Sequence, residues 1–316
     1  MQVITHLREL PPVPVQAVII NCGTRWVSTL ALLSTLRHAG LPVLVIDCES
    51  ADGSERHFQL LSRQAGIKFH WLAWPLRPHG VTLDRLFSEI AADTVLLVDS
   101  DVDIRDTGLV DDMYRRLREH GDAYGAGFLQ PGEWLGPPQH LLPPSTGYFA
   151  ERMWIPLVLL RTAPVREAIA AGASFMARRP FQEVAGYPRL SRLLGYRFRV
   201  PGLRHIKLPQ PAARGGSAAL WVDGIRPAFV DYDTGAALHA RLTTNAHPLA
   251  AMPVARWGGV HHYHGVTRAR LGGVLRAAAA KLGMVSKQSQ AEPLTAEEDA
   301  KQRLAAQYGI DIASLA

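Results

Sequence analysis

The stretch Thr94-Val95-Leu96-Leu97-Val98-Asp99-Ser100-Asp101-Val102-Asp103 runs from an uninterrupted apolar segment into a group of acidic residues. The apolar part predicts a strand that is buried on both faces. Unpaired carboxylates are too costly inside such a strand, so we expect them at its carboxyl end, where a cation or hydrogen-bond donors can meet them. Residues two apart in an extended chain point to the same side, so Asp99 and Asp101 can converge on one Mg²⁺ or Mn²⁺. The alternative is that these residues only cap the following turn.

The chain before this stretch alternates between two hydrophobic patterns. Short apolar runs predict buried strands at 15–20, 43–46 and 69–74, besides the one at 94–98. Apolar residues at helical spacing predict helices around 27–34, at 54–65 and around 83–90. Such alternation implies right-handed crossovers and a parallel sheet, which binds ligands beyond the carboxyl ends of its strands. The candidate functional segments are therefore those after the strands: 21–25, 47–50, Pro75 and 99–103.

Composition limits the classes of function. The chain has 316 residues, of which 47% are hydrophobic and 20% charged, as in an ordinary globular protein. It contains neither an apolar run long enough to cross a membrane nor a secretory signal, and its two cysteines suit a reducing compartment, so we expect a cytoplasmic protein. The net charge of +6 favours anionic partners, with a codon-driven bias towards arginine as the alternative. Because the cations are scattered and no nucleic-acid-binding motif is present, we expect no binding to nucleic acid.

The rest of the chain gives weaker patterns. Asp106 is expected to cap a helix over 109–117 that ends at Gly121. A strand is expected at 154–160, at an edge or with a bend because of Pro156. The remaining expected elements are a helix at 162–171, loops at 130–144 and 201–217, a basic helix at 268–284, a linker at 286–293, and a last helix that starts with a capping box at 295–298 and stops at Gly309.

Three features of the first half resemble GT-A glycosyltransferases, and glycosyltransferase family 2 in particular. The first is the opening strand followed by Asn21 and a helix. The second, Val45-Ile46-Asp47-Cys48-Glu49-Ser50-Ala51-Asp52-Gly53-Ser54, is similar to the family's Val-Asp-Asp-Gly-Ser-x-Asp-Gly-Ser segment, from which Cys48-Glu49 departs. The third, Leu97-Val98-Asp99-Ser100-Asp101, is similar to the family's Asp-x-Asp segment. The resemblance covers roughly residues 14–130.

The resemblance implies a fold and an activity. The fold would be α/β, with a mostly parallel, Rossmann-like GT-A sheet flanked by helices. Residues 1–130 would bind the donor, residues 131–266 would form an α+β acceptor half that carries the catalytic residue, and residues 267–316 would form a helical extension. The activity would be the transfer of a sugar, with inversion, from a nucleoside diphosphate donor to a hydroxyl acceptor. UDP is favoured over GDP as the donor nucleotide.

The resemblance also implies roles for residues that come after the strands. Asn21 and Arg25 would lie beside the nucleotide, Asp47 or Glu49 would accept hydrogen bonds from its base or ribose, and Ser100 would lie at the donor between the metal-binding acids. Asn21 has the alternative of a turn residue and Arg25 that of a solvated helix start. Asp52-Gly53-Ser54 is expected to form a turn into a helix.

Three histidines occur within the segment Val260-His261-His262-Tyr263-His264-Gly265. Neutral imidazole is a good ligand for Mn²⁺ or Zn²⁺. In a strand, His262 and His264 would face one way. The segment looks like the downstream histidine element that completes the metal site of some GT-A enzymes, with His262 as the preferred ligand and His264 as the other candidate. The alternative is a histidine cluster that holds no metal.

The segment Phe229-Val230-Asp231-Tyr232-Asp233-Thr234-Gly235 leads into a predicted helix at 236–242. An inverting transferase needs a carboxylate that removes the acceptor hydroxyl proton. Asp233 is the first candidate, Asp231 the second and Asp223 the third, although Asp is also a common helix cap. Aromatic residues of this half would stack on an acceptor sugar or pack in the core. They are Trp154, Trp221, Tyr232 and Trp257.

Three other functions have less support in the sequence. A sugar nucleotidyltransferase would need a Gly-rich basic loop after the first strand, where 21–25 holds a single Gly. A hydrolytic metalloenzyme would need more ligands at metal spacing. A protein that only binds a nucleotide or sugar fits poorly with acidic strand ends. The basic helix at 268–284 leaves room for weak contact with a membrane surface, although a packing helix is the favoured interpretation. The last helix could pack on the domain, pair with a second copy of the chain or stay apart from both.

Overall fold

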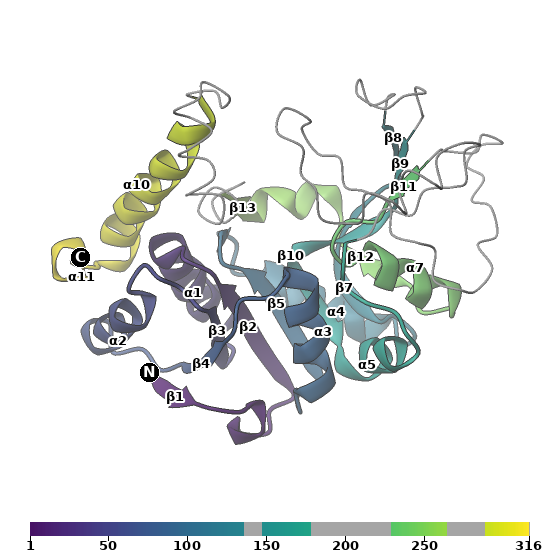
Figure 1. Cartoon of the computed structure of the whole chain (residues 1–316), viewed down its shortest axis with the longest axis horizontal. Helices are drawn as coiled ribbons and strands as arrows, with labels where there is room; N and C mark the ends of the chain where they lie inside the picture. The colour runs from purple at the N-terminus through teal and green to yellow at the C-terminus, as the bar shows by residue number, and fades with distance from the viewer. Residues whose placement is uncertain (136–146, 178–228, 264–287, 316) are drawn as a thin grey trace, which may run out of the picture.

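One eight-stranded sheet forms the centre of the computed structural model, which describes residues 1–135, 147–177, 229–263 and 288–315 (Figure 1). Its strands, in spatial order, are β1 (Gln2–Ile4), β4 (His70–Trp74), β3 (Val43–Cys48), β2 (Val15–Asn21), β5 (Thr94–Asp99), β10 (Arg152–Arg161), β7 (Gly125–Gln130) and β12 (Leu249–Ala251). All neighbours are parallel except β10, which runs antiparallel to both β5 and β7. The mostly parallel α/β fold that the GT-A resemblance implied is confirmed.

Helices cover both faces of the sheet (Figure 1). One face packs on α1 (Arg25–Ala39), α2 (Ser54–Gln64) and α4 (Leu109–Glu119), and the other on α3 (His79–Glu89), α5 (Thr162–Ala170) and α7 (Ala236–Thr244). α10 (Gln288–Tyr308) lies against α1 (Figure 1). Along β2, Val18 belongs to one apolar cluster and Ile19 to the other, and neither side chain is exposed. The apolar runs of the sequence therefore arise because the central strands are buried on both sides.

The elements predicted for the first hundred residues are confirmed. The four predicted strands appear as β2, β3, β4 and β5, and α1, α2 and α3 lie between them. Gly40 ends α1 in the left-handed conformation, with φ of 61°, as its position predicts. Asp52 accepts hydrogen bonds from the backbone and hydroxyl of Ser54, which places the predicted turn at the start of α2.

Other predictions are corrected. β10 lies in the centre of the sheet, so the edge alternative for Pro156 is wrong. The register of β10 against β7 shifts between Met153 and Val158, and this irregularity accommodates a residue without an N–H. Gly108 rather than Asp106 is the N-cap residue of α4, although Asp106 accepts a hydrogen bond from the Gly108 N–H at 2.8 Å. The helix ends at Glu119, with His120 as its C-cap residue rather than Gly121.

Two small sheets and the C-terminal residues complete the described structure. β8 (Glu133–Leu135), β9 (Gly147–Phe149) and β11 (Phe229–Asp231) form one small sheet, so the predicted loop at 130–144 is wrong at 133–135. β6 (Val102–Ile104) pairs with β13 (Val260–His262). α10 begins at Gln288, which contradicts both the linker and the predicted helix start at 295. The short helices are η1 (Leu7–Glu9), η2 (Val254–Gly259) and α11 (Ile312–Leu315).

The predicted loop at 201–217 and basic helix at 268–284 lie outside the described residues. Among the helices that the structure does describe, none has the length and apolarity that a membrane crossing requires.

His57 connects α2 to the last described residues of the chain through hydrogen bonding. Its side chain is buried between the Thr29 hydroxyl, 2.8 Å from Nε2, and the backbone oxygen of Leu315, 3.3 Å from Nδ1. Burial lowers the pKa of His57 from 6.5 to about 4, although the Leu315 carbonyl opposes this shift. The folded state therefore holds His57 neutral at neutral pH.

We expect acid to destabilise the fold through His57. Because its folded pKa is lowered, its contribution to stability is complete above its ordinary pKa and is lost as the pH falls towards the folded value. The loss should reach roughly 3 kcal/mol. Urea unfolding at pH 7.5, 6 and 4.5 measures it, and His57→Gln should flatten this part of the profile. The exposed His120→Gln is the control, and an equal flattening in it would contradict the assignment.

Candidate active site

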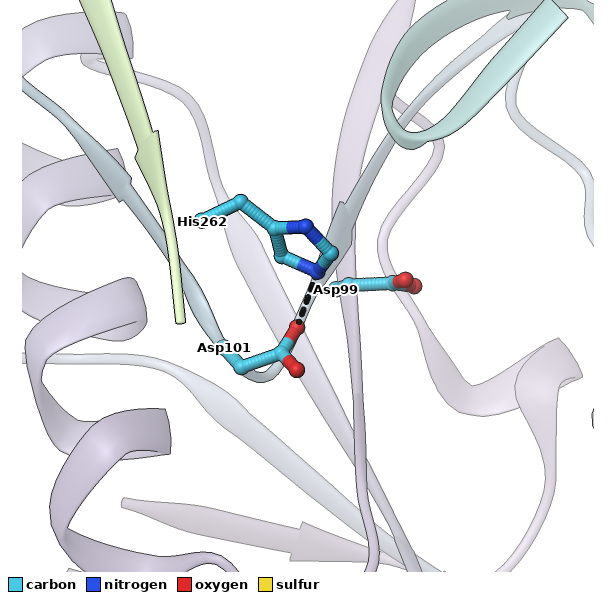
Figure 2. A group of neighbouring side chains, drawn as sticks. All are labelled: Asp99, Asp101 and His262. Carbon is cyan, nitrogen blue, oxygen red and sulfur yellow. Dashed lines mark hydrogen bonds and ion pairs between the residues drawn. The ribbon is translucent and has the colours of Figure 1, made fainter. Parts of the chain in front are cut away.

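The acidic end of β5 lies opposite a histidine from the far end of the chain. Asp99 is the last residue of β5, Asp101 comes two residues later, and β6 begins at Val102. β13 pairs antiparallel with β6 and places His262 opposite Val102. Figure 2 shows the result: the Nε2 of His262 lies 3.1 Å from the Oδ1 of Asp101, with Asp99 beside them. Strand pairing thus brings together residues that are more than 150 positions apart in the sequence.

Asp99, Asp101 and His262 form a group that fits a divalent cation. One ligand atom of each lies within 4.8 Å of the others. Burial raises the pKa of Asp99, the neighbouring Asp101 raises it further, and His79 and His262 oppose the rise. Two carboxylates held together in a partly buried place gain from a positive ion between them. Two carboxylate oxygens and an imidazole nitrogen are a donor set suited to Mn²⁺, and the carboxylates alone suit Mg²⁺.

This group opens onto a cavity of about 640 Å³. The cavity brings together six residues that the sequence singled out: Asp99, Ser100, Asp101, Trp154, Asp233 and His262. Its other lining residues include Ile20, Cys22, Cys48, Leu76, Arg77, His79, Thr82, Gln130, Arg152 and Thr234. A cavity of this size accommodates a small-molecule ligand, with acidic groups on one side and basic groups nearby.

Asp233 reaches the cavity from the loop before α7. Gly235 is the N-cap residue of α7, with φ of 82°, so the alternative that Asp233 itself caps this helix is wrong. A side chain at Gly235 would collide with Ile155, since a Cβ there would lie 2.7 Å from its Cδ1. The Oδ2 of Asp233 lies 3.8 Å from the Nε of Arg152. The carboxylate of Asp233 thus lies in the same cavity as Asp99 and Asp101, and its ion pair is with Arg152.

The other residues predicted for the acceptor half differ in position. Asp231 is buried at the end of β11 and does not line the cavity. Trp154 lines the cavity with its ring edge-on to His262, the ring centres being 5.6 Å apart, and Trp257 stacks at an angle on Trp154. Trp221, Asp223 and His264 lie outside the described residues.

Asn21 lies at the centre of a buried polar network. Its side chain has no exposed surface. Its amide nitrogen donates to Asp47 Oδ1 at 2.7 Å and to the Ser50 and Ser54 hydroxyls, and its Oδ1 accepts from Ser28 and Thr24. Asp47 also accepts hydrogen bonds from the backbone and hydroxyl of Ser50. The network fixes the segments after β2 and β3.

The remaining donor residues predicted from the resemblance lie near this network. Arg25 begins α1, and its guanidinium carbon lies 5.5 Å from the centre of the Trp26 ring. Glu49 is exposed, with φ of 51°. Within the described residues, neither they nor Asn21 and Asp47 line the 640 Å³ cavity, so their contact with a donor stays a prediction.

Three basic residues of the cavity are absent from the site predicted from the sequence. Arg77 and His79 come after the carboxyl end of β4, and His79 Nε2 lies 3.7 Å from Asp99 Oδ1. Arg152 begins β10. The rule that ligands bind beyond strand ends could have found Arg77 and His79, because they come after the third predicted strand. Arg152 gave no such signal.

No family model and no curated protein matches the chain. Solved structures do match it, and these matches are similarities of fold alone. S. aureus TarS 1–349 with UDP-GlcNAc is 18% identical over 49% of this chain and 47% of that chain, with a TM-score of 0.34. The Mycobacterium tuberculosis glucosyl-3-phosphoglycerate synthase, crystallised with Mn²⁺, UDP and phosphoglyceric acid, is 17% identical over 36% of this chain and 42% of that chain, with a TM-score of 0.30.

A 4-diphosphocytidyl-2C-methyl-D-erythritol synthase from Anaerococcus prevotii DSM 20548 is 9% identical over 57% of this chain and 82% of that chain, with a TM-score of 0.37. The match to the TarS structure spans about half of that chain's length, 47%.

Proposed function

We propose that this protein is a glycosyltransferase that moves a sugar from a nucleoside diphosphate donor, with UDP favoured, to a hydroxyl acceptor with the help of Mn²⁺ or Mg²⁺. The observation that carries the proposal is the group of Asp99, Asp101 and His262 at one side of a cavity that also holds Asp233. A divalent cation at a site of this kind neutralises charge on the departing diphosphate. Both cysteines are free, which supports a cytoplasmic setting.

The residues around the group have complementary roles in this proposal. Asp99, Asp101 and His262 would hold the cation, and His262 would keep its position through its hydrogen bond to Asp101. Arg77 and His79 line the same cavity; Arg77 would offer positive charge and His79 a ring N–H to phosphate oxygens. Trp154 would supply an apolar face for a sugar ring.

Asp233 is the residue that we propose as the general base of an inverting reaction. It would accept the proton of the acceptor hydroxyl as that oxygen attacks the anomeric carbon. Arg152 would hold its carboxylate in the cavity through the 3.8 Å ion pair. Asp231 is the weaker candidate because it is buried and away from the cavity.

The test is a thermal-shift screen of the full chain against UDP, GDP, CDP and dTDP, each with Mn²⁺, Mg²⁺ or EDTA. We expect the largest rise in Tm when a nucleoside diphosphate and a metal are present together, because each completes the binding site of the other. A response to nucleoside triphosphates alone would indicate a nucleotidyltransferase instead. A response to metal alone would indicate a hydrolase, and no response to any combination would reject the proposal.

Asp233→Asn should separate binding from chemistry. The amide keeps the size of the side chain but cannot take up the proton, so we expect the transfer rate to fall at least about 100-fold. The combined nucleotide and metal shift in Tm should stay within error of the wild type. Asp231→Asn is the matched comparison, and a larger loss of rate in it than in Asp233→Asn would reverse the assignment.

A further inference from the structure

A second cavity, of about 420 Å³, lies where α1, β6 and α10 meet. Its lining comprises Arg37 and His38 from the last turn of α1, Ile104 and Arg105 at the end of β6, and Arg303 and Gln307 from α10. α10 packs against α1 (Figure 1), and its residues Arg303 and Gln307 line one side of the cavity. None of these residues lines the 640 Å³ cavity, so the two cavities are separate.

The second cavity carries an excess of positive charge. Three of its lining residues are arginines from three different elements. One carboxylate, the buried Asp103, is ion-paired with two of them: its Oδ2 lies 2.9 Å from Arg105 Nε and 2.7 Å from Arg303 Nη2. Two other carboxylates lie near this group: Asp106 pairs with Arg256, whereas Asp299 accepts a hydrogen bond from the neutral Tyr263 hydroxyl and keeps its negative charge. Among the described residues, three guanidinium groups against Asp103 and Asp299 leave one positive charge in excess.

Several hydrogen-bond donors of the second cavity also lack partners. Within the described residues, the buried Nε of Arg303 and the buried Nδ1 of His38 make no hydrogen bond. Arg37 reaches the backbone oxygen of Gln307 at 3.4 Å, and its guanidinium carbon lies 5.5 Å from the centre of the Tyr308 ring. Arg105 uses its Nε on Asp103, which leaves its terminal nitrogens without a hydrogen bond among the described residues. The terminal nitrogens of the exposed Arg37 and Arg105 are therefore the donors that a ligand in the cavity could reach.

Local stability explains only part of the cluster. Arg37 and His38 lie in the last turn of α1, where positive charge interacts favourably with the helix dipole. That effect does not require Arg105 and Arg303 to converge on the same cavity from β6 and α10. Asp103 would be neutralised by one arginine, yet it has two.

We propose that the second cavity is a binding site for a phosphate-bearing anion. Guanidinium groups match phosphate oxygens in pairs, and several of them converging is the arrangement that proteins use to recognise phosphate. The cavity is larger than inorganic phosphate alone, which suits a phosphomonoester with a small organic group. The same chemistry is presented by a free metabolite and by an anionic lipid headgroup at a membrane surface.

Isothermal titration of the full chain in EDTA tests the proposal, with inorganic phosphate and glycerol 3-phosphate as probes. EDTA keeps divalent cations out of the first cavity. We expect saturable binding, at least about 10-fold weaker in Arg37→Gln and in Arg105→Gln, which corresponds to about 1.4 kcal/mol. Arg63→Gln, an exposed arginine on α2, and Asp101→Asn should bind as the wild type does. Absence of binding, or binding that both cavity variants retain, would overturn the proposal.

The fold of each variant needs its own check, because Arg105 pairs with a buried carboxylate. Arg37 is exposed and, among the described residues, its contacts are the Gln307 backbone oxygen and the Tyr308 ring, so Arg37→Gln should lower the Tm only slightly. Arg37→Lys should restore part of the affinity, since it restores the charge without the fork of donors. Equal affinities in Arg37→Gln and Arg37→Lys, both at the wild-type level, would exclude Arg37 from the site and contradict the proposal.

Vesicles distinguish the two sources of the phosphate group. Vesicles of phosphatidylcholine with phosphatidic acid should sediment the wild-type chain but not Arg37→Gln if the ligand is a headgroup. Binding of glycerol 3-phosphate in solution without vesicle binding assigns the site to a free metabolite. If both Arg37→Gln and Arg105→Gln still bind the vesicles as the wild type does, and neither soluble probe binds, the proposed site is rejected.

Discussion

Asp101→Asn is expected to abolish the combined effect of nucleotide and metal on Tm and to reduce transfer at least about 1,000-fold. The substitution removes one negative charge from the group of Asp99, Asp101 and His262 but keeps the shape of the side chain. An amide oxygen can still accept a hydrogen bond from His262, which lies 3.1 Å away in the wild type. The loss would therefore come from weaker binding of the cation rather than from a collapse of the strand pair β6–β13.

Two measurements separate these causes. The Tm without ligands should change little, because Asp101 lies at the surface of a cavity and its backbone bond to Tyr263 is untouched by the change. Asp111→Asn, an exposed acidic residue in the first turn of α4, is the charge-matched control and should keep both the shift and the activity. A wild-type shift in Asp101→Asn would mean that the cation, if it binds, does so elsewhere.

Asn21→Asp is expected to destabilise the fold strongly, with a loss of at least about 3 kcal/mol in the free energy of unfolding at pH 7. The new carboxylate would lie where the amide nitrogen now donates to Asp47 Oδ1 at 2.7 Å. Two carboxylates would then face each other in a buried place. The Ser54 hydroxyl would also lose the hydrogen bond that it now accepts from the Asn21 amide.

The pH dependence of this variant identifies the cause. Repulsion between the two carboxylates raises the folded pKa of the pair, so stability is greater at low pH and is lost as the pH rises through that value. Relative to the wild type, the deficit measured by urea unfolding should be smaller at pH 4.5 than at pH 7.5. Asn245→Asp at the exposed end of α7 supplies the control for the same change of residue. A deficit that does not depend on pH would point to lost packing instead.

The sequence predicts well the strands that are buried on both faces. The apolar runs of β2, β3, β4 and β5 leave no other reasonable interpretation, and the acidic residues after β5 could only lie at its end. It predicts β10 as a strand at 154–160 but leaves its place in the sheet open, because Pro156 is compatible with an edge or with a bend. Only the structure reveals that this residue falls where the register against β7 shifts. Likewise, the Ser/Thr-x-x-Glu pattern at 295–298 resembles a helix start but lies within α10.

The candidate site shows the same division. Asp99, Asp101 and His262 could be named in advance because acidic residues at a strand end and a histidine cluster are unusual patterns. Arg152 could not, because an arginine at the start of an apolar strand is ordinary. It acquires a position in the cavity only because β10 runs antiparallel beside β5. Asn21 is the reverse case. Its position after β2 suggested contact with a ligand, but its side chain is wholly enclosed by protein.

The placement of β10 has a consequence for how the two halves of the chain depend on each other. This strand comes from beyond residue 130, yet it bonds to β5 from the first half and to β7 at its end. Cut from it, β5 would present a bare row of amides and carbonyls along its whole length. The sheet therefore crosses the predicted boundary near residue 130, and a protein cut there would lose the ladder that joins β10 to β5 and β7.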